Sequence, residues 1–95
     1  MKLFRLNNGS WTDDVLPLCH FETVRDVNDD DFKAEPKEDI PKGTRLEDAK
    51  VFLNCYGTYV SCRYKGKHYN VKAAFVKVIP SKEGEALVQE KMRLS

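Results

Sequence analysis

The sequence lacks the features that mark membrane-spanning, exported or disulfide-bonded proteins. No apolar run approaches the roughly 18 residues that cross a bilayer, and the longest run spans only residues 73–76. The first eight residues turn polar too early for a secretory signal peptide. The three cysteines are an odd number and too few for a disulfide scaffold. These absences predict a cytoplasmic chain with free thiols.

An excess of charge of one sign is also missing, because 16 Lys and Arg residues face 15 Asp and Glu residues. The near-neutral balance excludes a uniform polycation or polyanion. It is nevertheless a cancellation: residues 1–40 carry 5 basic and 10 acidic side chains, and residues 41–95 carry 11 and 5. We therefore expect a dipolar molecule, whose asymmetry orients encounters with a charged partner or lets the two halves attract each other.

The length of 95 residues suits one domain, and 33% charged residues are typical of a water-exposed globular chain. The pattern of turns and alternating apolar residues predicts a mostly β fold. We expect four segments: an N-terminal hairpin and extension over 1–25, an acidic loop over 26–39, a barrel of strands over 40–79, and a C-terminal helix or tail over 81–95.

Local sequence signals support the N-terminal hairpin, the acidic loop and the C-terminal helix. An Asn8-Gly9 turn would place Trp11 opposite Leu6 in the N-terminal hairpin. The acidic loop has seven acidic residues against two lysines, which predicts a solvated segment. Ser81 can cap a C-terminal helix that has glutamates in its first turn and cations near its end.

The clearest signal in the chain is a hairpin over residues 59–72, centred on a Lys65-Gly66 turn. This turn pairs Tyr64 with Lys67, and paired residues share a face of the sheet. One face is then apolar, with Val60, Cys62, Tyr64, Tyr69 and Val71. The other face is polar, with Tyr59, Ser61, Arg63, His68, Asn70 and Lys72.

Three runs resemble parts of an SH3-like barrel, particularly the bacterial SH3 type. Ile40–Leu46 is similar to the turn into the second strand of that barrel, Tyr59–Val71 to its central meander, and Ala73–Ile79 to its 3₁₀ turn and closing strand. The resemblance implies a small barrel with Tyr59 near the usual groove Trp and Phe75 near the groove Tyr.

Residue types that bind metals are present, but they lack the spacing of a metal site. No Cys-x-x-Cys pair or close His pair exists, and the predicted hairpin puts Cys62 and His68 on opposite faces. Asp26-x-Asn28-x-Asp30 begins like a calcium loop, but Lys37 stands where the bidentate Glu belongs. We predict no metal, no cofactor and cysteines buried as small apolar groups.

Catalytic motifs are scarce as well. There is no Gly-x-Ser-x-Gly elbow and no phosphate-binding glycine-lysine loop. The adjacent Cys19-His20 pair would point to opposite sides of an extended chain. A lone His more often titrates at the surface than acts as a general acid or base. The sequence therefore predicts that the protein is not an enzyme.

Two binding functions remain. The favoured one is a protein-interaction module, of the kind found among small bacterial or phage adaptor and modulator proteins. Its partner-binding residues would be Tyr59, Phe75, Asp29, Asp30 and Asp31. The alternative is RNA or DNA binding through cations that pair with phosphates, namely Arg63, Lys65, Lys67, His68 and Lys72. For both surfaces, the simpler interpretation is a solvated face or loop that binds nothing.

Overall fold

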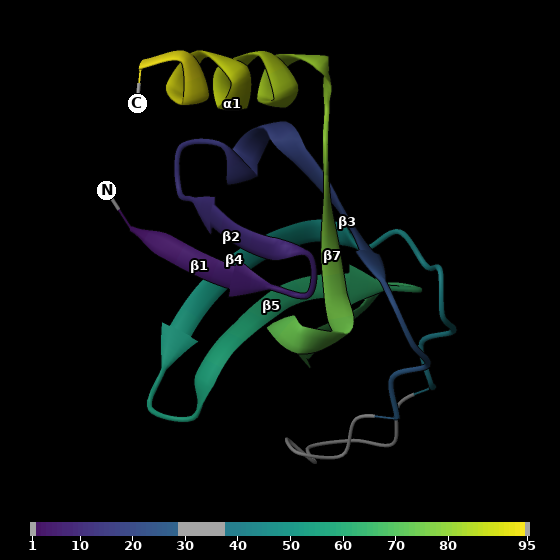
Figure 1. Cartoon of the computed structure of the whole chain (residues 1–95). Helices are drawn as coiled ribbons and strands as arrows, with labels where there is room; N and C mark the ends of the chain where they lie inside the picture. The colour runs from purple at the N-terminus through teal and green to yellow at the C-terminus, as the bar shows by residue number, and fades with distance from the viewer. Residues whose placement is uncertain (1, 29–37, 95) are drawn as a thin grey trace.

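The computed structural model describes residues 2–28 and 38–94, which form a mostly β protein with one helix (Figure 1). The fold class predicted from the sequence, mostly β with a short C-terminal helix, is thereby confirmed. In chain order the elements are β1 (Leu3–Leu6), β2 (Gly9–Thr12), the 3₁₀ turn η1 (Leu16–Leu18), β3 (Cys19–Thr23), β4 (Glu47–Asn54), β5 (Gly57–Tyr64), β6 (Lys67–Lys72), the 3₁₀ turn η2 (Ala73–Phe75), β7 (Val76–Pro80) and α1 (Lys82–Leu94). No helix in the described part of the chain is long and apolar enough to cross a membrane.

The strands form three small antiparallel groups, β1–β2, β3–β7 and β4–β5–β6. The segment before β4 connects two of them, because the Leu46 N–H donates to the Phe21 carbonyl at 2.9 Å. The register of β4 then shifts between Glu47 and Lys50, where Asp48 has a positive φ of 50°. An irregularity of this kind bends a strand. The chain therefore passes from the segment beside β3 directly into β4, which belongs to the three-stranded sheet.

A single apolar cluster lies between these groups. Its fully buried side chains come from both halves of the chain and include Ile40, Val60, Val71, Val76 and Val78. Burial of each of these side chains stabilises the fold by about 1.5–3 kcal/mol relative to exposure. The core therefore holds strands that are far apart in the sequence.

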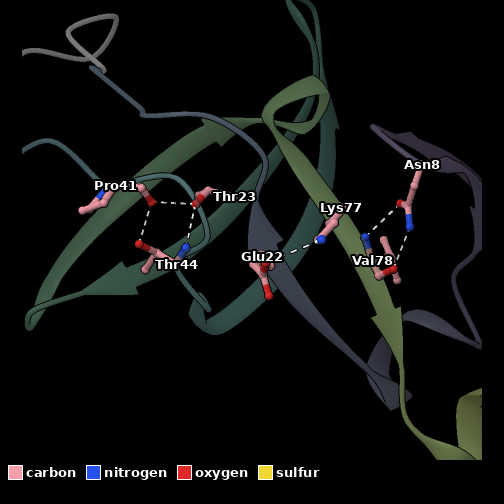
Figure 2. A network of polar contacts seen from close by, with 7 residues as sticks. All are labelled: Asn8, Glu22, Thr23, Pro41, Thr44, Lys77 and Val78. Atoms are coloured by element: carbon pink, nitrogen blue, oxygen red, sulfur yellow. Dashed lines mark hydrogen bonds and ion pairs between the residues drawn. The ribbon is translucent and has the colours of Figure 1, made fainter.

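Thr23 fixes the segment that leads toward β4 (Figure 2). Its hydroxyl donates to the Pro41 carbonyl at 2.8 Å and accepts the Thr44 N–H at 3.0 Å. The Thr44 hydroxyl donates to the same Pro41 carbonyl at 2.6 Å. Thr23 is buried, and these bonds satisfy its hydroxyl.

The N-terminal hairpin forms, but its predicted register is wrong. The turn begins one residue earlier, so Trp11 lies opposite Phe4 and not opposite Leu6. The cause is a tertiary contact, in which the Asn8 side chain accepts from the Val78 N–H at 2.9 Å and donates to its carbonyl at 2.7 Å (Figure 2). This pair of bonds holds the turn against β7.

The predicted C-terminal helix is confirmed, with Ser81 at its start. The Gly84 N–H donates to the Ser81 hydroxyl at 3.2 Å, and this hydroxyl donates to the Leu18 carbonyl at 2.5 Å. A Cβ atom on Gly84 would lie 2.9 Å from the same carbonyl, so glycine permits the close approach of α1 to η1.

Candidate interaction surface

The hairpin of β5 and β6 has the register that the sequence predicts. Tyr64 pairs with Lys67, and Lys65 and Gly66 have positive φ angles of 49° and 78°, as a type I′ turn requires. The side that faces the core is closed, since Val60, Cys62, Tyr69 and Val71 are at most 2% exposed. We call the opposite side of the three-stranded sheet the outer face; it carries Lys50, Phe52, Tyr59, Ser61, Arg63, His68, Asn70 and Lys72.

All five residues named by the alternative prediction are exposed. Arg63, His68 and Lys72 lie on the outer face, while Lys65 and Lys67 lie at the hairpin turn beside it. Lys50 joins them from β4, where it pairs with Ser61. Sequence reasoning missed Lys50, because it depends on the pairing of β4 with β5 across an irregular register. Lys50, Arg63 and Lys72 thus lie together on the outer face. Lys67 shares the opposite face with its partner Tyr64, and the Lys65 Nζ lies 5.5 Å from the Tyr64 ring centroid, so these two lysines lie at the turn and not on the outer face.

Arg63 and Lys65 each lie beside an acidic side chain of the described part of the chain. Lys65 forms an ion pair with Glu38 at 3.0 Å, and Arg63 lies 4.0 Å from Asp48. The hydrogen bond and charge of Lys65 lower the pKa of Glu38, and the Glu38 carboxylate raises the pKa of Lys65. Both pairs are largely exposed and therefore screened by salt. A polyanion can exchange for these carboxylates at small cost.

His68 and Asn70 provide polar groups between the cations. The His68 Nε2 lies 2.7 Å from the Ser61 hydroxyl. This contact crosses from β6 to β5 and holds the imidazole over the outer face. Asn70 is half-buried beside Ser61 in the next cross-strand row. The outer face can therefore offer hydrogen bonds as well as positive charge.

Tyr59 does not serve as the exposed aromatic contact that the sequence predicts. Its side chain is only 6% exposed and stacks on Phe52, with ring centroids 5.9 Å apart and an interplanar angle of 22°. Alternation along β5 identifies the correct face, but it does not reveal the neighbour on β4 that covers this ring. The expected exposure of Tyr59 is therefore wrong, while its role in partner binding stays a prediction.

Phe75 is half-buried in η2, and cations lie over its ring. The Arg25 guanidinium carbon lies 4.5 Å from the ring centroid, and the Lys72 Nζ lies 5.9 Å from it. Asp29, Asp30 and Asp31, the other predicted partner-binding residues, lie outside the described residues. The role of Phe75, Asp29, Asp30 and Asp31 in partner binding stays a prediction.

The connection between β4 and β5 carries an apolar surface that sequence reasoning missed. Leu53 and Tyr56 are 68% and 78% exposed, and Cys55 between them is exposed as well. This end of the hairpin projects from the body of the molecule (Figure 1). The exposure follows from the length of β4 and β5, which extend beyond the core that covers Val51 and Val60.

The cysteines differ from the uniform burial that the sequence predicts. Cys62 is buried, but Cys55 is exposed, because the β4–β5 turn projects into solvent. Cys19 is half-buried, where burial raises the pKa of its thiol and the Val15 carbonyl accepts its S–H at 3.2 Å. A thiol with a raised pKa is a poor nucleophile at neutral pH.

The two histidines lie in different settings. His20 has its Nδ1 2.8 Å from an Arg45 guanidinium nitrogen. Because a guanidinium can only donate, this ring nitrogen must accept, and its lone pair is occupied. Among residues 2–28 and 38–94, no group of three or more His, Cys, Asp or Glu side chains could hold a metal ion. His68 differs from His20, because its Nε2 lies beside the Ser61 hydroxyl on the outer face.

Comparisons with protein-family models, with curated proteins and with solved structures found no match. The functional argument therefore depends on the geometry of this chain.

Proposed function

We propose that the protein is a non-enzymatic binding module of the cytoplasm and that its outer face binds single-stranded nucleic acid. The observation that carries this proposal is the exposure of Arg63, His68 and Lys72 on the outer face, with Lys65 and Lys67 exposed at the adjoining turn. Phosphate groups pair with such cations, and this term supplies most of the affinity of sequence-independent binding.

The spacing along β6 also suits a flexible strand. Outward-facing residues recur every two positions, which is about 6.6–6.8 Å along a strand. His68, Asn70 and Lys72 have this spacing, which is close to the separation of consecutive phosphates in an extended single strand. A rigid duplex would have to lie across a narrow three-stranded surface and would meet fewer of these groups.

The barrel itself is proposed to be SH3-like. Support comes from the order of the elements from β3 onward, in which a bent strand, a hairpin and a 3₁₀ turn precede a last strand that returns to β3. In such an arrangement, the three-stranded sheet presents one face to the core and leaves the other for a ligand.

The proposal is tested by fluorescence anisotropy with a labelled oligothymidylate. The triple variant R63Q/K65Q/K67Q should bind at least tenfold more weakly than the natural chain. The plot of log affinity against log salt concentration has a negative slope, and each lost phosphate contact should reduce the magnitude of this slope by about 0.7. The matched control K2Q/K42Q/K82Q removes the same charge from exposed positions elsewhere and should bind nearly as well as the natural chain. Equal losses in both variants, or no salt-sensitive binding by the natural chain, would contradict the proposal.

A second candidate is protein binding through the apolar end of the β4–β5 hairpin, favoured by the exposure of Leu53 and Tyr56. Exposed apolar side chains that gather on a projecting hairpin are typical of interaction sites. In a pull-down from nuclease-treated lysate, L53S/Y56S should lose a partner that the control L3S/M92S retains. The control changes two apolar residues of similar exposure at other sites. Identical recovery by both variants would remove this candidate.

A further inference from the structure

β4 is an edge strand, and within the described part of the chain its side away from β5 has no partner. Its only neighbour in the sheet is β5. The isolated bridge between Glu22 and Arg45 ends before β4 begins. No residue of β4 takes part in the backbone hydrogen bonds that the described chain makes outside its paired strands and its helix. This eight-residue strand therefore leaves a row of backbone donors and acceptors open to a further strand.

The pairing with β5 shows which residues carry these open groups. In an antiparallel pair, residues that bond to the neighbouring strand alternate with residues that point away from it. Asn54 and Gly57 flank a two-residue turn and form the closing hydrogen-bonded pair of the hairpin. Every second residue before Asn54 therefore bonds to β5, and the residues between them point the other way. We call these outward-pointing residues the free edge: Ala49, Val51 and Leu53.

The opposite edge of the sheet is less suited to a further strand. It is formed by β6, which carries Lys67, His68 and Lys72. Charged side chains, lysine above all, are a usual protection of edge strands against pairing. β4 has the uncharged run Val51–Leu53, which is rich in residues that favour strands. Of the two edges, β4 is therefore the stronger template.

An apolar groove of about 470 Å³ lies beside the free edge. Its lining is mostly apolar and comes from β1, η1, β3 and β4, with two charged members: Phe4, Leu16, Pro17, Phe21, Ala49, Val51, Asp13 and Lys50. Leu53 points to the same face of β4 as Val51, because the two residues are two positions apart. Its side chain is 68% exposed. One strand thus carries both a wall of an open apolar groove and an exposed leucine on the same face.

We propose that the free edge pairs with the free edge of a second copy of this chain about a twofold axis, with Val51 opposite the partner's Val51. The Val51 N–H then donates to the carbonyl of the partner's Val51, and the Leu53 N–H donates to the carbonyl of the partner's Ala49, in both directions. Leu53 of each copy lies opposite the partner's Ala49, which lines the groove. The exposed leucine of one copy thus meets the apolar groove of the other.

Charge and side-chain size select this register. A shift in one direction would place Lys50 directly opposite the partner's Lys50, and like charges at opposed positions are destabilising. A shift in the other direction would move Leu53 from the small Ala49 to the larger Val51. In the proposed register, Lys50 instead lies opposite the partner's Phe52, an aromatic residue that a cation can approach favourably.

Dimer formation goes beyond the proposed function and does not depend on nucleic-acid binding. The pairing joins two three-stranded sheets into one sheet. Antiparallel pairing keeps opposed side chains on the same face, so both outer faces lie on the same side of the joined sheet. The contact is small, which gives a weak dimer that depends on protein concentration.

Sedimentation velocity over a range of protein concentrations tests the dimer. The natural chain should change from monomer to dimer as its concentration rises. L53S should raise the dissociation constant about a hundredfold, because two leucine side chains leave the contact and each accounts for roughly tenfold. Y56S changes the adjacent turn, and L3S changes a leucine of similar exposure on β1. Both controls should stay within about twofold of the natural chain.

The controls also separate the dimer from the second candidate function, which uses Leu53 and Tyr56 together. If Y56S dimerises as the natural chain does while L53S does not, the dimer stands whether or not a different protein is captured. If the natural chain stays monomeric at every concentration, or if L53S and Y56S lose the dimer equally, the pairing is wrong. Neither result changes the expected loss of oligothymidylate binding by R63Q/K65Q/K67Q.

Cysteine substitutions test the register in a C55S chain, which lacks the exposed thiol. V51C should form an intermolecular disulfide on oxidation with diamide. Opposed Cα atoms in a hydrogen-bonded pair lie about 5.5 Å apart, which is within the usual span of a disulfide. K50C changes the neighbouring residue and should stay unlinked, because it lies opposite the partner's Phe52. A disulfide in K50C and none in V51C would overturn the proposed pairing.

Discussion

The two faces of the β5–β6 hairpin have opposite environments although their residues alternate along the same strands. The inner face, with Val60, Cys62, Tyr69 and Val71, is almost completely buried and joins the core. The outer face exposes Arg63, His68 and Lys72 to solvent. The difference indicates that the inner face provides stability and leaves the outer face available for binding, so substitutions on the two faces should have separable effects.

Tyr59 gives the largest expected effect, because it is an outer-face residue that behaves as part of the core. Y59A should lower the free energy of unfolding by about 3–5 kcal/mol, the range for removal of a large buried aromatic ring. Loss of the stacking with Phe52 contributes to this value. Chemical denaturation measures the free energy of unfolding. R63A is the control on the outer face, and its free energy of unfolding should lie within about 0.5 kcal/mol of that of the natural chain. If Y59A lowered the free energy of unfolding only slightly, Tyr59 would behave as a surface residue and not as part of the core.

Val60 tests the inner face next. V60A removes apolar volume from a fully buried position and should cost about 2–3 kcal/mol. At a temperature where this variant is still folded, its affinity for oligothymidylate should equal that of the natural chain. Weakened binding by folded V60A would show that the two faces are coupled and not separable.

The smallest expected effect is the loss of thermal stability at acidic pH that comes from the ion pair between Glu38 and Lys65. A carboxyl group whose pKa is lowered in the folded state stabilises the fold above its unfolded pKa, and this contribution is lost as pH falls through the folded pKa. The thermal midpoint of the natural chain should therefore fall slightly more on acidification than that of E38Q. E90Q, which changes an exposed carboxylate on α1, serves as the control and should follow the natural chain. Identical profiles for E38Q and the natural chain would mean that the pair contributes nothing.

Sequence patterns succeeded where structure is determined locally. The Lys65-Gly66 turn fixes its own φ angles, and the register of the whole hairpin follows from it. The cap at Ser81 is equally local. A helical turn that includes Ala73 and Ala74 also precedes the last strand, which begins at Val76 and not at Phe75 as expected.

Sequence patterns failed where distant segments decide the outcome. The N-terminal turn shifts because Asn8 bonds to Val78, 70 residues away. Tyr59 is buried by Phe52, a neighbour that only the β4–β5 register supplies. Arg25 lies over the Phe75 ring for the same reason, because the hydrogen bond from the Val24 N–H to the Phe75 carbonyl joins two remote segments of the chain. Side-chain alternation and turn residues contain no information about such contacts.

The most direct test of the central claim is a nuclear magnetic resonance titration of isotope-labelled protein with oligothymidylate. The account predicts that the largest shift changes fall on Lys50, Arg63, Lys67, His68 and Lys72. Changes confined to residues 53–56 of the β4–β5 turn or to α1, or no changes at all, would contradict it.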